Sequence, residues 1–308
     1  MEDENAQPKF KRMYIRYNAQ KLGFLGGCRP IISLDGCHLK GRFGGQILSA
    51  IARNANDNIF PVAFAVVEQE NKDSWGLIPA IEMLFLTCEH RYCVKHIYNN
   101  FKVDRKGLEL KDALWRCAGA TTIREFERRM QEMKDLDVKA WEYLANINPA
   151  QWSKSYFSSR VLCDCLANNL SESFNAMILE VRDNPILAML EWIRVRLMTK
   201  QYKKMRGIAK YTGKVCPNIQ DKLEKLKHES IPFSATPAGS FMYEVDNGRE
   251  RHVVDLAKKA CSYRIWDLTG LPCKHGISAI VKNLKKVEDY VYPCYLKETF
   301  TETYKEII

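Results

Sequence analysis

The stretch "ACSYRIWDLTGLPCKHG", residues 260–276, constrains the fold of this 308-residue chain more than any other feature. Cys261, Cys273 and His275 are residue types that bind zinc, and structural zinc takes four tetrahedral ligands. Tyr263 stands where a cysteine would complete a Cys-x-Cys pair. Its phenol is a poor ligand because it must lose a proton with an ordinary pKa of about 10. The pattern predicts a small metal-binding module in which three of the four ligands are present.

Composition sets the broad class of the protein. The chain is 46% hydrophobic and 11% aromatic, which predicts a folded protein with a sizeable core. No apolar run approaches the roughly 20 residues of a membrane helix, so no membrane association is expected. The 11 cysteines are an odd number, which favours thiols in a reducing compartment, some of them metal ligands. The net charge of +10 favours a nucleic-acid partner, although a merely basic protein fits equally well.

Hydrophobic patterning divides the chain into three parts. Residues 31–70 contain apolar runs separated by turn residues and predict three strands. The middle predicts helices, one opening with a capping box from Thr122 to Glu125 and another with Pro185 in its first turn. Residues 210–235 are lysine-rich and predict a linker or an exposed helix. Short strands with a turn at "DNG", followed by a helix at "CKHGISAIVKNL", complete a fold of the α/β (α+β) class.

Five stretches in a fixed order carry a family resemblance. They are "FKRMYIRYNAQKLGFLGGCRPIISLDGCHLKG", "EHRYCVKHIYNNF", "NNLSESFNAMILEVRDNPI", "CSYRIWDLTGLPCKHGISAI" and "YVYPCYLKETF". Together they resemble plant Mutator-like element (MULE, MuDR) transposases and host proteins derived from them, from about residue 9 onward. The resemblance implies five parts: a lead-in (1–30), a truncated ribonuclease-H-like transposase domain with a helical insertion (31–205), a linker (206–238), a SWIM-type zinc finger (239–285) and a tail (286–308).

The resemblance also implies acidic site residues. Asp35, after "IISL", matches the family's first catalytic acid, and Glu172 in "NNLSESFN" matches the third. In the family these carboxylates hold two Mg²⁺ ions, which stabilise the attacking and leaving oxygens of phosphoryl transfer. The alternatives are an ordinary strand-end acid for Asp35 and a solvated acid in the first turn of a helix for Glu172.

The family's second acid has no counterpart in this sequence. A strand ending in an Asp should lie between Trp75 and Gly76, yet the two residues are adjacent. Asp73 or Glu82 would need sub-ångström placement to replace it. The resemblance therefore implies a degenerate, catalytically inactive transposase, unless the chain is a mis-spliced reading of an intact gene. Mg²⁺ is expected only if the chain is active.

Metal ligands follow from the same resemblance. The SWIM pattern is Cys-x-Cys followed by Cys-x-His, so Cys261 would be its first ligand, Cys273 its third and His275 its fourth. Tyr263 replaces the second, and water, Cys294 or His252 would then complete the site. We therefore expect Tyr263→Cys to tighten zinc binding.

A second Cys/His pair also matches the family. Cys93 and His96 share a helix face and could bind metal, although a buried cysteine with a hydrogen-bonded histidine is the simpler interpretation.

The expected protein is thus transposase-derived, nuclear, zinc-binding through a degenerate SWIM finger, and without catalytic activity. Basic stretches such as "KFKRMYIR" and "KQYKKMRGIAKYTGK" predict weak, salt-sensitive, non-specific DNA binding. Because the resemblance starts near residue 9, specific recognition of transposon ends is not expected. The alternatives are an active MULE transposase with two-metal chemistry and a module that binds only proteins.

Overall fold

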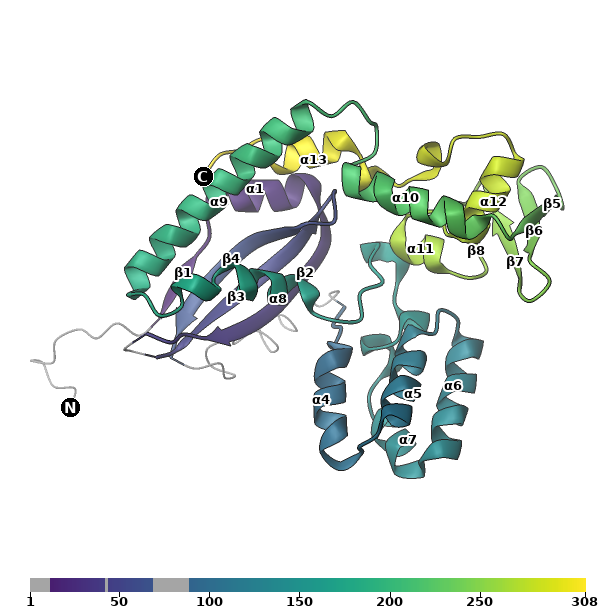
Figure 1. Cartoon of the computed structure of the whole chain (residues 1–308), viewed down its shortest axis with the longest axis horizontal. Helices are drawn as coiled ribbons and strands as arrows, with labels where there is room; N and C mark the ends of the chain where they lie inside the picture. The colour runs from purple at the N-terminus through teal and green to yellow at the C-terminus, as the bar shows by residue number, and fades with distance from the viewer. Residues whose placement is uncertain (1–11, 42–43, 69–88) are drawn as a thin grey trace, which may run out of the picture.

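Two antiparallel four-stranded sheets, one near each end of the chain, organise the fold (Figure 1). The computed structural model describes residues 12–41, 44–68 and 89–308. The junction of Trp75 and Gly76, with Asp73 and Glu82, lies outside these ranges. Helices pack on both sheets and also form a separate bundle, so the expected α+β class is confirmed.

The N-terminal sheet has the strand order β1-β4-β3-β2. Its strands are β1 (Met13–Ile15), β2 (Cys28–His38), β3 (Gln46–Asn54) and β4 (Ile59–Val67). The three strands predicted within residues 31–70 are β2 to β4, joined as an antiparallel meander. Strand β1 was not predicted. It pairs with β4 and brings part of the expected lead-in into the sheet.

A bulge in β4 divides the side chains of that strand between two cores. Ala63 pairs with Ala50, but the next pair joins Pro61 to Ile51, so β4 holds one extra residue. An extra residue reverses which side chains face each side of a strand. Phe64 accordingly packs with the core formed by α8 and α9, whereas Phe60 belongs to the core that continues into the C-terminal part.

Four helices form a compact bundle in the region where a helical insertion was expected, at the lower right of Figure 1. They are α4 (Val94–Asp104), α5 (Leu108–Gly119), α6 (Ile123–Leu136) and α7 (Val138–Ala145). Their apolar faces bury Phe101, Leu114 and Trp152 in a core of their own. The predicted cap of α6 is present, because Thr122 Oγ1 accepts a bond from the Glu125 amide at 3.2 Å. The Glu125 carboxylate accepts from the Thr121 amide instead of the Thr122 amide.

Two helices after the bundle return the chain to the first sheet. Helix α8 (Asn169–Met177) and the long α9 (Ile186–Ala209) bury Phe174, Leu190 and Ile193 against the sheet. Pro185 precedes α9 as its N-cap residue. Short 3₁₀ helices occupy the connections: η1 Pro149–Gln151, η2 Lys154–Tyr156, η3 Ser159–Val161, η4 Leu179–Val181, η5 Val287–Tyr290 and η6 Pro293–Tyr295.

The second sheet belongs to a larger C-terminal unit than the sequence suggested. Its strands are β5 (Ser234–Pro237), β6 (Met242–Asp246), β7 (Arg251–Asp255) and β8 (Ala260–Cys261), with the predicted "DNG" turn between β6 and β7. Helices α11 (Ile265–Thr269) and α12 (Lys274–Lys282) follow. Residues 206–238 are not a linker. They contain α10 (Pro217–Ser230), which buries Ile219 and Leu223 in this unit's core, and strand β5.

The C-terminal segment is also part of the fold. Helix α13 (Lys297–Thr303) lies beside α1 (Asn18–Gly27), so residues 286–308 are not a free tail (Figure 1). The Tyr304 ring packs edge-on against Phe60 at a centroid distance of 5.7 Å, and its hydroxyl accepts a bond from Asn54 at 2.6 Å. Residues near both ends of the chain therefore close one core.

Candidate metal centre

Three of the predicted ligands meet where β8 and α12 approach each other. Cys261 ends β8, and Cys273 is the extended N-cap residue of α12, which places His275 in the first turn of that helix. The Nδ1 atom of His275 lies 3.8 Å from the Cys261 Sγ and 3.8 Å from the Cys273 Sγ. All three side chains are buried. Gly276 follows, and the Trp266 ring packs directly against its Cα face.

A second histidine belongs to the same cluster. His252, on β7, joins Cys261 and His275 in a group whose ligand atoms all lie within 4.8 Å of one another. Its ring centroid lies 4.1 Å from that of His275, with the planes tilted by 31°. These three residues form a group that could hold a metal ion. The predicted ligand Cys273 is not a member of this group, although its Sγ lies 3.8 Å from the His275 Nδ1. Cys294, the other residue considered for the open position, belongs to η6, where burial raises the pKa of its thiol to about 11 beside Arg29 and Asp57.

Tyr263 covers the cluster. Its ring meets the His275 ring edge-on at 5.0 Å and the His252 ring at 5.4 Å. Its backbone amide donates to the Cys261 Sγ at 3.4 Å, and burial raises the pKa of its phenol. The aromatic side chain at the cysteine position therefore shields the cluster from water, and its raised pKa disfavours the phenolate that a metal would require.

The two thiols are electrostatically unequal. A hydrogen bond from Cys261 lowers the pKa of Cys273, and His275 and the Gly276 amide lower it further, whereas burial opposes the shift. The same hydrogen bond, together with burial, raises the pKa of Cys261. The thiolate is the form that binds metal, and it is favoured at Cys273, where the N-terminus of α12 also supplies positive potential.

The two acids lie on neighbouring elements at one surface of the first sheet. Asp35 is on β2, and the Asn175 amide of α8 donates to its Oδ2 at 3.3 Å. Glu172, in the first turn of α8, pairs with Lys95 of α4 at 2.6 Å. This bond, together with the charges of Glu172 and Asp35, raises the pKa of Lys95. An ammonium group thus accompanies the acids, and no sequence pattern had singled out Lys95.

Helix α8 is held on β2 by polar contacts around its N-cap. The Asn168 amide nitrogen donates to the Leu34 carbonyl at 3.1 Å, and Ser33 bonds to the Asn168 side-chain oxygen. The polar side chains at this end of α8 therefore contact two different neighbours. Asn168 and Asn175 turn to the sheet, and Glu172 turns to α4.

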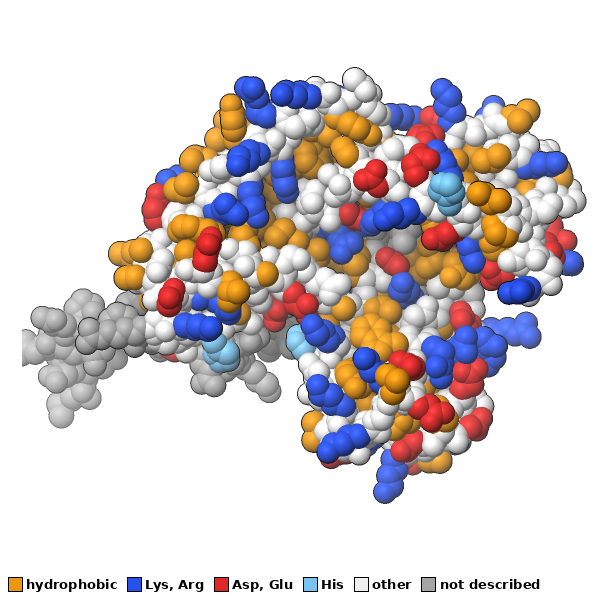
Figure 2. Space-filling view, viewed as in Figure 1, with side chains coloured by type: hydrophobic (Ala, Val, Ile, Leu, Met, Phe, Trp, Pro, Cys, Tyr) orange, Lys and Arg blue, Asp and Glu red, His pale blue; other side chains and the backbone are white. Residues whose placement is uncertain are grey.

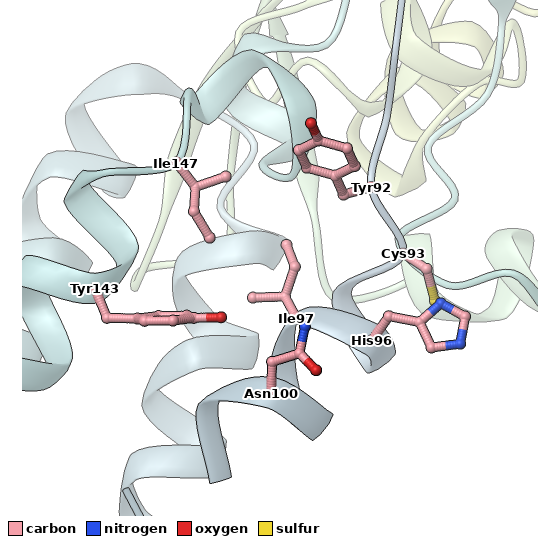
Figure 3. Close-up of a pocket in the computed structure, with 7 residues that line it drawn as sticks. All are labelled: Tyr92, Cys93, His96, Ile97, Asn100, Tyr143 and Ile147. Carbon is pink, nitrogen blue, oxygen red and sulfur yellow. The ribbon is translucent and has the colours of Figure 1, made fainter. Parts of the chain in front are cut away.

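Cys93 and His96 line a pocket of about 330 Å³ between α4 and the end of α7. Figure 3 shows Tyr143 and Ile147 on one side and the residues of α4 on the other. The Cys93 Sγ accepts a bond from the Asn168 amide at 3.3 Å, which gives this thiol a structural contact to α8. The ligand-type group found among the described residues is that of His252, Cys261 and His275, and it does not include this pair. Cys93 is partly buried with a hydrogen-bonded thiol, whereas His96 is exposed, so the structure shows a packing role for Cys93 only.

The basic stretch 200–214 is only partly available to a ligand. Figure 2 shows Lys and Arg side chains spread along the outer side of α9. Lys203, Arg206 and Lys210 are exposed, and Tyr202 lies beside Arg206. Lys204 turns inward to the Tyr304 hydroxyl, and burial lowers the pKa of its ammonium to about 8.

Comparisons with family models, with curated proteins and with solved structures find no match to this chain. Each helix in the described part of the chain is too short or too polar to cross a membrane. The residues themselves therefore carry the functional argument.

Proposed function

We propose that this protein is a transposase-derived chain without strand-transfer activity, whose C-terminal SWIM-type module binds one zinc ion and which binds DNA weakly. One observation carries the zinc assignment. Cys261, Cys273 and His275 come from two different elements, yet both sulfurs lie 3.8 Å from the same imidazole nitrogen.

The donor set fits zinc. With Zn–S near 2.3 Å and Zn–N near 2.0–2.1 Å, a tetrahedral site separates sulfur from nitrogen by about 3.5 Å. The 3.8 Å separations are close to that value. Cysteine and histidine ligands that are fully buried are typical of a structural site. Zinc there would link β8 to α12 and contribute its binding energy to folding.

The first sheet supports the ribonuclease-H-like assignment, and its acids support the loss of activity. An antiparallel meander with Asp35 on its first strand is the expected start of that fold. Two-metal chemistry requires several convergent carboxylates. Asp35 and Glu172 supply two, and Lys95 already neutralises Glu172. Among the described residues, these two carboxylates alone do not fit a pair of Mg²⁺ ions.

The positive charge of the protein supports the proposed DNA binding. The net charge is +10, and Lys203 and Arg206 of α9 and Lys210 directly after it are exposed. Tyr202 lies beside Arg206. Cations that neutralise phosphates give affinity that falls steeply with salt and is independent of sequence. We expect weak duplex binding that is lost between low and physiological salt, and that weakens further when three residues are replaced by alanine: Lys203, Arg206 and Lys210. Salt-independent affinity, or an unchanged affinity in this variant, would favour a protein-interaction module.

Zinc binding is tested by metal content and by competition with a chromophoric chelator. The parent should hold one zinc ion per chain, and Cys273→Ser and His275→Ala should each weaken it. His228→Ala is the matched control, because His228 is exposed near the end of α10. A parent chain that binds no zinc under reducing conditions would refute the proposal.

Activity is tested separately with Mg²⁺ and Mn²⁺ on plasmid DNA. No nicking or strand transfer is expected. Metal-dependent nicking that disappears in Asp35→Asn would instead establish an active transposase.

A further inference from the structure

We propose that His252 is the fourth zinc ligand, giving a Cys₂His₂ site, and that Glu250 positions both imidazoles. This inference rests on the proposed zinc binding and deepens it. The ligand that replaces the absent cysteine then lies on β7, whereas Tyr263 follows the end of β8.

The register of the β7–β8 hairpin puts His252 on the correct face. Val254 pairs with Cys261. Side chains two residues apart on a strand share a face, so His252 lies on the Cys261 face, one diagonal step along the ladder. Diagonal neighbours are within reach of a long or aromatic side chain. The position is confirmed by the ligand atoms of His252, Cys261 and His275, which all lie within 4.8 Å of one another.

The two imidazoles have matching orientations. The Nδ1 atom of His275 faces the sulfurs, and its Nε2 atom lies 3.7 Å from the Glu250 Oε1. The Nε2 atom of His252 lies 3.6 Å from the Glu250 Oε2, which leaves its Nδ1 on the other side of the ring, 3.2 Å from the Ser262 hydroxyl. Each carboxylate oxygen therefore faces one Nε2 atom.

This arrangement has a direct chemical use. A ligating histidine usually donates its other ring N–H to a carboxylate, which fixes the tautomer and makes the ligating nitrogen a better donor. On metal binding, a small approach of the Glu250 carboxylate would let it accept from both Nε2–H groups. The Nδ1 atom of His275 already faces the sulfurs, whereas the Nδ1 atom of His252 would exchange the Ser262 hydroxyl for the metal. The Nε2 atom of His275 is otherwise buried without a hydrogen-bond partner among the described residues. Lys274 donates to the Glu250 Oε1 at 2.7 Å and so holds the carboxylate in place.

Charge balance also favours a second histidine. Two thiolates neutralise Zn²⁺, so a buried site with two neutral imidazoles carries no net charge. Burying an uncompensated charge costs several kcal/mol. Tyr263 can then remain as a cover over both rings, with no need to ionise.

The first test is zinc X-ray absorption on the full zinc-loaded chain. We expect two sulfurs at about 2.3 Å and two imidazole nitrogens at about 2.0–2.1 Å. In chelator competition His252→Ala should weaken zinc binding by about 100-fold or more, and Glu250→Gln by about 10–100-fold, the usual cost of losing an orienting carboxylate. Cys294→Ser and His228→Ala should match the parent.

Rescue variants guard against simple misfolding. His252→Cys should bind zinc tightly with three sulfurs. Because His252 already supplies the fourth ligand, Tyr263→Cys should change the parent's affinity little, in place of the tightening expected from three ligands alone. Combined with His252→Ala, it should restore binding. A spectrum with one imidazole, parental affinity in His252→Ala, or lost affinity in Cys294→Ser would overturn the assignment of His252 while leaving zinc binding intact. A parent that binds no zinc would instead refute the proposed function on which this inference depends.

Discussion

Arg264 joins the C-terminal module, which holds the candidate metal site, to the helical bundle. Replacing it should lower the free energy of unfolding by removing this link. The residue directly follows Tyr263 and adopts a left-handed backbone with φ of 70°. Its guanidinium donates to backbone carbonyls of the bundle and of the segment that follows it: those of Thr121, Lys154, Ser155 and Phe157. We predict that Arg264→Met destabilises the zinc-loaded chain by about 3 kcal/mol.

The magnitude follows from the geometry of the guanidinium. A hydrogen bond to a charged group contributes about 1.5–3 kcal/mol. The Nη1 atom shares its hydrogen bonds among three of the carbonyls, and the Nη2 atom donates to the Phe157 carbonyl at 2.6 Å. We therefore count the equivalent of one full hydrogen bond for each nitrogen. The sum is about 3–6 kcal/mol. Partial exposure of Arg264 lets water replace some of the loss, which favours the lower end. Methionine keeps the packing of the aliphatic stem.

Urea denaturation of zinc-saturated protein measures this loss. Arg264→Lys should recover only part of the stability, because an ammonium group cannot reproduce the planar fork. Arg160→Met is the control, since its side chain is 62% exposed and its contact with Glu89 is a surface pair at 3.9 Å. If Arg264→Met lies within about 0.5 kcal/mol of this control, the usual range for surface substitutions, the guanidinium does not link the two parts.

Two further outcomes are expected. In thermal denaturation, Gly276→Ala should lower stability by about 1 kcal/mol. The new Cβ would lie 2.7 Å from buried Trp266 ring carbons, and this overpacking outweighs the gain in helix propensity. Gly207→Ala should stabilise the chain in the same assay, because its new Cβ would point into open space on α9. Burial alone would raise the pKa of Glu288, but bonds from Gln220 and Lys227 lower it from 4.5 to about 2, so its contribution is present above pH 4.5 and lost as pH falls toward 2. Glu288→Gln should therefore lose less stability than the parent over that window in acid titrations, and an identical loss in both would contradict this assignment.

Local chemistry predicted the parts of this structure that depend on neighbouring residues. The Thr122 cap, the "DNG" turn and the approach of Cys273 to His275 each involve residues close in sequence, whose preferred conformations bring them together. Cys261 is also near in sequence, and α11 returns the chain to it. The grouping of these three residues was therefore predictable, whereas the choice between His252 and Cys294 required the register of β7 and β8.

Contacts distant in sequence could not be predicted in this way. Strand β1 and helix α1 have few buried apolar residues of their own, and α13 is short. Their contacts are distant in sequence: β1 pairs with β4, and α1 packs against α13. Lysine-rich α10 resembled a linker because its buried stripe is narrow, with Ile219 and Leu223 as its fully buried apolar residues. Its partner α12 lies much further along the chain.

This shared core changes what zinc removal should do. A small free-standing finger unfolds without its metal. Here Trp266 and Ile277 are fully buried in the same core as Leu223 of α10 and Phe60 of the first sheet. We therefore expect chelation to loosen residues 250–276, where the ligands lie, while α10 and the first sheet remain folded. Hydrogen exchange should show loss of protection in β7, β8 and the start of α12, with nearly unchanged far-ultraviolet circular dichroism. If protection is also lost throughout α10, zinc stabilises the whole core. If protection in β7 and β8 is unchanged, zinc stabilises neither the ligand-bearing segment nor the core.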